Sequence, residues 1–192
     1  MKKYQIIYAD PPWRYQDKSK SHGGGAESHY PTMAIEDICA LSIPADKDAV
    51  LLLWTTYPQL KEGIQVLEAW GFKYKTVAFT WVKTNRDGSV YMGMGRHTRA
   101  NAEICLLGTK GKGLPRKDAG VYQTQLHERQ KHSKKPDIFR NEIVRLYGDV
   151  PRIEMFARND GSRNLFNENP LDGWSAWGNE VQSDIELKTH AK

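Results

Sequence analysis

The run Ala49–Trp54 (AVLLLW) limits the possible folds of this chain more than any other feature, because six consecutive apolar residues leave no polar face. Such a run is typical of a strand that is buried on both faces of a sheet. Four further runs have strand character and are expected to share that sheet: Tyr4–Ala9, Lys73–Lys83, Ala102–Gly108 and Ile153–Ala157. A length of 192 residues is enough for one domain with a sizeable core.

Helical patterns alternate with these runs. The segment Thr32–Leu41 predicts a short helix capped by Thr32, and Tyr57–Trp70 predicts an amphipathic helix with Gly71 after its end. Pro136–Tyr147 predicts a third helix that Gly148 terminates. Alternation of this kind indicates an α/β domain, with a mostly parallel sheet and helices on both faces. We expect the domain to cover residues 1–181 and residues 182–192 to form a frayed polar tail.

Composition indicates a cytoplasmic protein with a polyanionic partner. Two cysteines, neither in a CxxC motif, indicate a reducing compartment, and no apolar run is long enough to span a bilayer or to act as a signal peptide. The net charge is +5, and two basic stretches, KGKGLPRK (110–117) and RQKHSKK (129–135), are expected in loops. Each could be solvated surface alone, but together they favour nucleic acid.

The first strand ends at Asp10-Pro11-Pro12-Trp13, a carboxylate and a large aromatic on a stiff turn. Ligands of parallel sheets bind beyond the carboxyl ends of the strands, where this motif is expected. A carboxylate, a fixed carbonyl and a flat ring suit a planar group that carries an NH2, such as adenine. Two acceptors would stabilise the amine as it becomes tetrahedral, and Trp13 would stack on the base. A purely structural turn is the alternative.

Three irregular stretches are expected at the same sheet edge as this motif. They are long for a compact domain, which is typical of functional loops. They comprise Arg14–Pro31, Thr84–Arg99 and Lys110–Ser133.

The motif Asp10-Pro11-Pro12-Trp13 resembles the signature of the MT-A70 methyltransferases, relatives of the permuted β-class DNA adenine methyltransferases. The resemblance extends from about Tyr4 to Val181, through YPTM (30–33), LLLWTT (51–56), EICLLGTKG (103–111), SKKPD (133–137), IEMFAR (153–158) and GWSAWGNE (173–180). It implies a Rossmann-like fold that depends on S-adenosylmethionine, in which the catalytic motif precedes the cofactor motifs. The absence of a G-x-G-x-x-G motif after the first strand agrees with that order.

The resemblance implies roles for individual residues. Asp10 and Pro11 would hold the adenine amine, Pro12 and Trp13 would shape the base pocket, and Tyr30 would stack on or gate the base. Lys135 would lie near the methionine carboxylate of the cofactor. Asp10 is also expected to contact the cofactor. The other residues expected there are Arg158, Asn159, Asp160, Asn179 and Glu180. Asp160 and Glu180 depart from the histidine and glutamine of some relatives.

Residues beside the pocket are expected to contact the nucleic acid. Glu103 would orient the substrate or a loop arginine, although a structural ion pair is an equal alternative. The basic residues in this group are Arg96, His97, Arg99, Lys110, Lys112 and Lys134. The spacing of His97, His127 and His132 fits no compact ligand set, so no metal is expected.

These features predict an enzyme that methylates the N6 amine of adenine. The compact single-domain form resembles prokaryotic or phage members of the family and favours DNA as the substrate. RNA methylation is the first alternative, and an inactive nucleic-acid-binding partner of the same fold is the second. The sequence does not decide whether the protein forms a homodimer.

Overall fold

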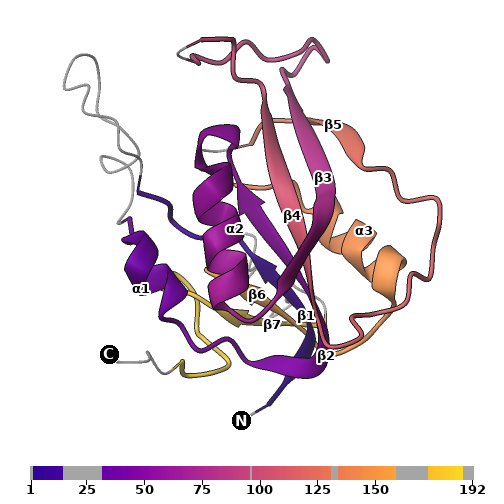
Figure 1. Ribbon diagram of the computed structural model, residues 1–192. Coiled ribbons are helices and arrows are strands. Elements are labelled where there is room, and N and C mark those ends of the chain that lie inside the picture. Colours follow the sequence, from indigo (N-terminus) through magenta and orange to yellow (C-terminus); the bar gives the residue numbers. More distant parts are fainter. Residues whose placement is uncertain (1, 15–31, 96, 131–133, 159–172, 188–192) are drawn as a thin grey trace.

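A computed structural model describes residues 2–14, 32–95, 97–130, 134–158 and 173–187. Its described part contains a seven-stranded sheet in the order β5-β3-β4-β2-β1-β6-β7. The strands are β1 (Tyr4–Ala9), β2 (Ala45–Thr55), β3 (Lys73–Thr84), β4 (Ala102–Lys110), β5 (Thr124–Glu128), β6 (Arg152–Met155) and β7 (Trp174–Trp177). The helices are α1 (Ile35–Cys39), the 3-10 turn η2 (Tyr57–Gln59), α2 (Leu60–Ala69) and α3 (Ile138–Tyr147). Figure 1 shows their arrangement.

Four of the six neighbouring strand pairs are parallel, namely β1 with β2, β1 with β6, β6 with β7 and β3 with β5. The strand β4 runs antiparallel to both β2 and β3. The prediction of a mostly parallel sheet is therefore confirmed. It follows that β1, β2, β3, β5, β6 and β7 all end at one edge, which we call the upper edge, whereas β4 begins there (Figure 1).

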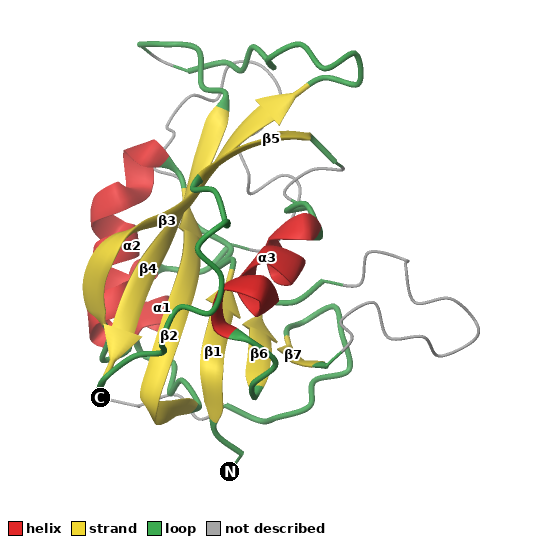
Figure 2. Cartoon of the chain, turned by 90° about the vertical axis from the view of Figure 1, so that its right-hand side faces the viewer, coloured by secondary structure: helices red, strands yellow, loops and turns green. Residues whose placement is uncertain are grey.

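The apolar run in β2 is explained by burial on both faces. Leu51 and Leu53 point to a core shared with α1 and α2, whereas Leu52 and Trp54 point to a core shared with α3. Figure 2 shows α1 and α2 on one side of the sheet and α3 on the other. Because successive strand residues face opposite ways, a strand between two helical layers must be apolar throughout.

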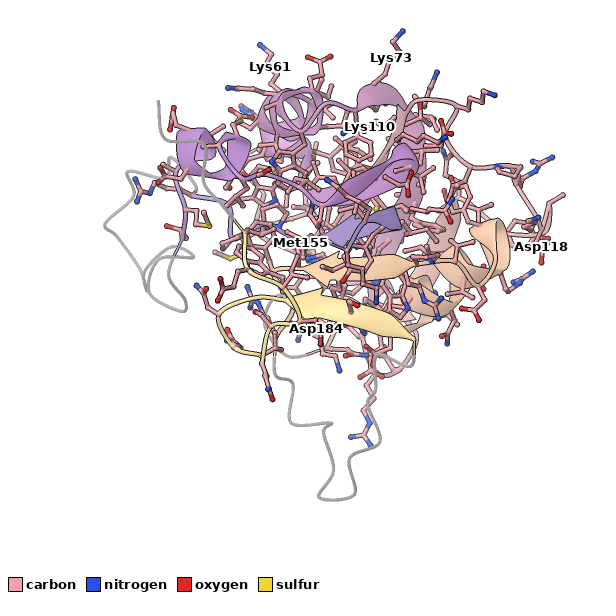
Figure 3. All side chains as sticks on the ribbon, turned by 90° about the horizontal axis from the view of Figure 1, so that it is seen from below. Lys61, Lys73, Lys110, Asp118, Met155 and Asp184 are labelled. Atoms are coloured by element: carbon pink, nitrogen blue, oxygen red, sulfur yellow. The ribbon has the colours of Figure 1, made fainter. Side chains whose placement is uncertain are left out.

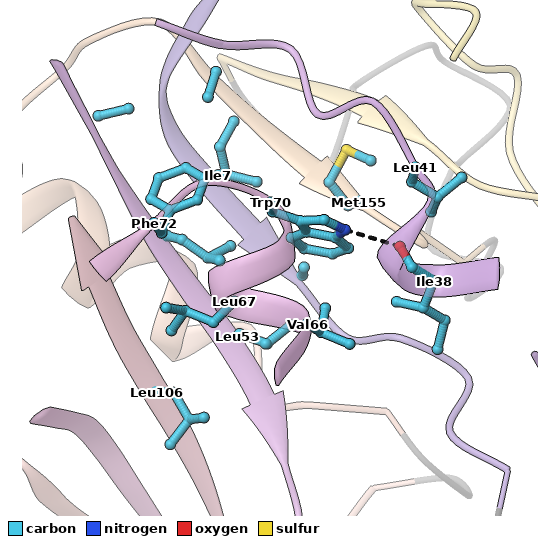
Figure 4. Close-up of a cluster of buried hydrophobic side chains, with 14 of the residues drawn as sticks. Ile7, Ile38, Leu41, Leu53, Val66, Leu67, Trp70, Phe72, Leu106 and Met155 are labelled. Atoms are coloured by element: carbon cyan, nitrogen blue, oxygen red, sulfur yellow. Dashed lines mark hydrogen bonds between the residues drawn. The ribbon is translucent and has the colours of Figure 1, made fainter. Parts of the chain in front are cut away.

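The core on the side of α1 and α2 has one polar anchor. The indole Nε1 of Trp70 donates a hydrogen bond to the carbonyl of Ile38, at 2.8 Å (Figure 4). This bond ties the end of α2 to α1 and satisfies the indole N–H of a residue that is only 5% exposed. Gly71 follows with φ of +81°, the conformation expected of a glycine after a helix.

Several predicted boundaries are wrong. The helix α1 begins at Ile35 with Ala34 as its N-cap, so Thr32 does not cap it. The strands β5 and β7 were not predicted. The tail is not frayed from residue 182, because Asp184 exchanges two hydrogen bonds with Ala176 and the side chains of Ile185 and Leu187 pack on the core. None of the described helices has the length and apolar character required to cross a membrane.

Candidate active site

The motif Asp10-Pro11-Pro12-Trp13 forms a turn at the upper edge, directly after β1. Within this turn, the Trp13 amide donates to the carbonyl of Pro11 at 2.9 Å, and the Met33 amide donates to the carbonyl of Pro12 at 2.9 Å. Each carbonyl oxygen has a second lone pair. The turn is thus fixed by main-chain bonds on both sides, and the Pro11 oxygen can still accept a second hydrogen bond.

Trp13 is not a stacking platform. Its side chain is 4% exposed, packs in the core with α1, and donates its indole N–H to the carbonyl of Trp54 at 3.0 Å. The expectation that its ring stacks on a base is therefore wrong for this conformation, because a buried ring offers no open face. Trp13 instead anchors the turn that presents Asp10.

Replacing Trp13 by alanine tests this anchoring role. We expect the Trp13→Ala variant to lose roughly 3–5 kcal/mol of unfolding free energy in urea titrations, as buried tryptophans do. Tyr57→Ala is the matched control, because that ring is 55% exposed and should contribute only about 0.5 kcal/mol. A change below about 1 kcal/mol for Trp13→Ala would contradict the anchoring role.

Four alternating charges form a chain beside the motif. The Lys135 ammonium lies 2.7 Å from Oδ2 of Asp10 and 3.2 Å from Oε2 of Glu103. Oε1 of Glu103 in turn pairs with Lys83. The four side chains are 10–24% exposed, and Lys135 also lies 5.6 Å from the centre of the Trp54 ring. Each charge therefore faces an opposite charge in a largely dehydrated setting.

The pKa of each acid in the chain is shifted for a physical reason. Burial raises the pKa of Asp10 above its ordinary value, and attraction to Lys135 offsets only part of that rise. Burial also disfavours the ionised form of Glu103, but Lys135 and Lys83 together outweigh it, so the pKa of Glu103 is lowered. Burial alone would lower the pKa of Lys135, yet its two carboxylates raise it. The chain thus favours the ionised forms of Glu103 and Lys135, whereas burial disfavours the ionised form of Asp10.

A second ion pair fixes the helix that follows Lys135. Arg140, on α3, binds Glu154, on β6, through two hydrogen bonds of 2.7 and 2.8 Å. A bidentate pair of this kind fixes orientation as well as distance. It holds the start of α3 against the sheet, and thereby positions Lys135 three residues before the helix.

The carboxyl ends of β6 and β7 complete the upper edge. Arg158 follows β6 closely enough for its charge to lower the pKa of Asp10. Asn179 and Glu180 follow β7 and are exposed. The segments that follow β6 and β7 approach each other so closely that a Cβ on Gly178 would lie 2.2 Å from the Ala157 carbonyl oxygen. This contact explains why a glycine stands in the GNE turn.

The predicted nucleic-acid contacts divide into two groups. His97 and Arg99 are exposed in the connection between β3 and β4 at the upper edge, and Lys134 lies near Lys135, 3.3 Å from Asp137. Lys110 and Lys112 lie elsewhere, because β4 is antiparallel and ends at the lower edge, which Figure 3 views directly. The expected placement of the stretch 110–117 beside the motif is therefore wrong. Lys110 lies seven residue steps along the strand from Glu103, or about 23 Å.

Some predicted residues lie outside the described part of the chain: Tyr30, Arg96, His132, Asn159 and Asp160. Lys83 was missed by the sequence prediction. The signal that could have found it is its position two residues after Trp81, on the same strand face, with Glu103 on the neighbouring strand. Within the described ranges, no three His, Cys, Asp or Glu side chains gather as metal ligands would.

Comparison with known proteins identifies the family of the chain. The sequence model of the MT-A70 family matches residues 4–180. The chain belongs to the MT-A70 family. The type II methyltransferase M.MunI, from a Mycoplasma species, is 36% identical over an alignment that covers the whole chain and 84% of that protein. The family expected from the motif is thus confirmed, and with it an enzyme of the methyltransferase class.

Two eukaryotic MT-A70 relatives are much longer than this chain. A rice protein named probable N(6)-adenosine-methyltransferase MT-A70-like is 30% identical, and the chain spans 23% of it. The human N(6)-adenine-specific methyltransferase METTL4 is 25% identical, and the chain spans 38% of it. The chain therefore corresponds to a minor part of these proteins, and nearly the whole of M.MunI.

Proposed function

We propose that this MT-A70 protein transfers a methyl group from S-adenosylmethionine to the N6 amine of adenine in DNA. The observation that carries the proposal is the Asp10 carboxylate, held on a rigid turn at the ligand edge of the sheet and bonded to Lys135. The likeness of the chain to M.MunI along almost its full length supports DNA as the substrate. We further propose that residues 1–181 form the catalytic unit.

The described residues fit the proposed cofactor. A methionine carboxylate needs a cation, which Lys135 provides, and ribose hydroxyls need the acceptors and donors that Arg158, Asn179 and Glu180 carry. Gly178 allows the turn after β7 to pack directly on the Ala157 main chain, which sets the position of Asn179 and Glu180 relative to Arg158. When bound, the cofactor supplies an electrophilic methyl group on a sulfonium.

Asp10 and the Pro11 carbonyl would act on the adenine amine. Lys135 binds Oδ2 of Asp10, so we assign Oδ1 to one amine hydrogen and the second lone pair of the Pro11 oxygen to the other. Both acceptors favour the tetrahedral nitrogen, which carries positive charge in the transition state. Because the turn is fixed before substrate binds, little reorganisation is needed. Asp10 would then hold the proton that the amine releases.

Glu103 and Lys83 would act through Lys135. Glu103 shares the Lys135 ammonium with Asp10. The positive charge of Lys135 therefore compensates the negative charge of Asp10 only in part. Lys83 compensates the second charge of the pair. The two residues are positioning residues in this scheme, and they need no contact with the base.

The cofactor site can be tested through Gly178→Ala. The added methyl group must displace the Ala157 main chain, and overpacking of this kind costs about 1–3 kcal/mol. We expect roughly tenfold weaker binding of S-adenosylmethionine by titration calorimetry. Gly120→Ala, in the exposed loop at the lower edge, is the control and should bind as the wild type does. Equal affinities for the two variants would contradict the proposed site.

One assay separates the proposed substrate from its alternatives. The protein is incubated with S-adenosylmethionine labelled on the methyl group and with DNA or RNA, single- or double-stranded, and the nucleosides are then identified. We expect N6-methyladenine in DNA. Product in RNA only would favour the alternative that the name of the rice relative suggests. Binding without product would favour an inactive partner, against which the intact Asp10–Lys135 pair argues.

A further inference from the structure

The connection between β3 and β4 forms an arm at the upper edge (Figure 1). Its base is tied to the site, because the Lys83 amide donates to the Asn101 carbonyl and the Tyr91 amide donates to the Lys83 carbonyl, both at 2.8 Å. Lys83 and Glu103, at the two ends of the arm, are also the outer half of the charge chain that reaches Asp10. Any ligand bound at Asp10 therefore lies at the base of this arm.

The sequence MGMG (92–95) gives one side of the arm an unusual surface. A Cβ on Gly93 would lie 1.9 Å from the Ala100 carbonyl oxygen, and a Cβ on Gly95 would lie 1.9 Å from that of Thr98. The two glycines thus pack against the returning half of the arm. Met92 and Met94 alternate with them and are 69% and 92% exposed. The close packing of glycines directs two large apolar side chains into solvent.

A single exposed apolar side chain on a protein surface is ordinary, whereas a group of them often marks a binding surface. We therefore interpret the exposure of both methionines as a sign of a binding surface. The surroundings are basic. The described residues of the arm (85–95 and 97–101) include two exposed arginines, Arg86 and Arg99, and a single aspartate, Asp87. Arg129, beside its base, stacks on Tyr91 with the guanidinium 4.4 Å from the ring centre. Two exposed apolar side chains, with Arg86 before them and Arg99 after them in the arm, are complementary to a duplex, in which phosphates surround stacked bases.

We infer that Met92 and Met94 form an apolar wedge that enters a DNA duplex beside the adenine and fills the base stack when the adenine turns out towards Asp10. The inference rests on the proposed function. An adenine inside a duplex is out of reach of Asp10, so it must leave the stack before transfer. Methionine inserts between base steps because it is long, unbranched and apolar. The Arg129–Tyr91 contact and the two glycines hold the wedge in place.

The test compares Met92→Ala/Met94→Ala with the wild type on two substrates, a duplex with a paired adenine and the same strand alone. We expect kcat/KM to fall about tenfold or more on the duplex and less than about twofold on the single strand. Met92→Leu/Met94→Leu, which keeps the apolar bulk, should retain activity on both. Tyr122→Ala is the matched control, since that exposed ring precedes β5 at the lower edge.

A second measurement needs no methyl transfer, and so separates failure of the wedge from failure of the proposed function. With 2-aminopurine in place of the adenine, the wild type and Tyr122→Ala should raise the fluorescence of the duplex on binding, and the double alanine variant should not. Equal fluorescence for all variants, no rise with the wild type, or equal losses on duplex and single strand would overturn the wedge. Equal losses would assign the two methionines to folding of the arm or to a protein contact.

Discussion

Asp10→Ala is expected to lower the rate of methyl transfer by roughly 10³-fold, the upper end of the effect of removing one preorganised group from a transition state. In the proposed mechanism, the carboxylate accepts a hydrogen bond that strengthens as positive charge develops on the amine nitrogen. The fold should survive, because Lys135 keeps Glu103 as a partner at 3.2 Å. Initial rates with labelled S-adenosylmethionine measure the loss, and calorimetry should show cofactor binding close to that of the wild type.

Asp118→Ala is the matched control for this substitution. Asp118 is also a carboxylate that binds a cation, Arg145, but it lies in the exposed loop between β4 and β5 at the lower edge. Its loss should leave transfer unchanged. A rate for Asp10→Ala within tenfold of the wild type would contradict the role of the carboxylate.

Lys135→Met is expected to have the second largest effect, because it removes the ammonium shared by Asp10 and Glu103. Breaking a buried ion pair by deleting one partner typically costs about 3–5 kcal/mol of unfolding free energy. Lys112→Met, an exposed lysine at the lower edge, should cost almost nothing and is the control. Urea titrations of the two variants measure the difference.

The same substitution should change the dependence of activity on pH. In the proposed mechanism the ionised form of Asp10 accepts the amine hydrogen bond, so we expect activity above the pKa of Asp10 and its loss as pH falls through that pKa. Lys135 lowers that pKa, and its removal must raise it. We expect the acid limb of kcat/KM to move towards neutral pH, with activity partly restored at alkaline pH. An unmoved limb would show that Asp10 does not titrate in the essential step.

The sheet was predictable where pattern and burial coincide. The alternation of β2 between two helical layers makes its sequence apolar throughout, so Ala49–Trp54 was recognisable without other information. The strands β5 and β7 were not, because they are short edge strands of five and four residues. In β5, exposed and half-buried residues alternate without any fully buried one. Such strands form by pairing with a neighbour rather than from their own apolar content.

The placement of the candidate site residues was predictable in part. Asp10, Lys135 and Arg158 gather at one edge because each follows or faces the end of a parallel strand, as the topology requires. Lys110 was misplaced because β4 was assumed to run with its neighbours. No helical pattern separates β3 from β4, and a connection without a crossover helix makes the two strands antiparallel. The burial of Trp13 depends on long-range packing that no local pattern reveals.

The proposed role of the Asp10 carboxylate, directing a methyl group to the N6 amine of adenine in DNA, can be tested in cells. The most direct measurement is mass spectrometry of nucleosides from the DNA of a host that lacks adenine methylation and expresses either the wild type or Asp10→Ala. We expect N6-methyldeoxyadenosine with the wild type, and a level at background with the variant at equal protein abundance. Background levels with both proteins, or equal methylation with both, would contradict it.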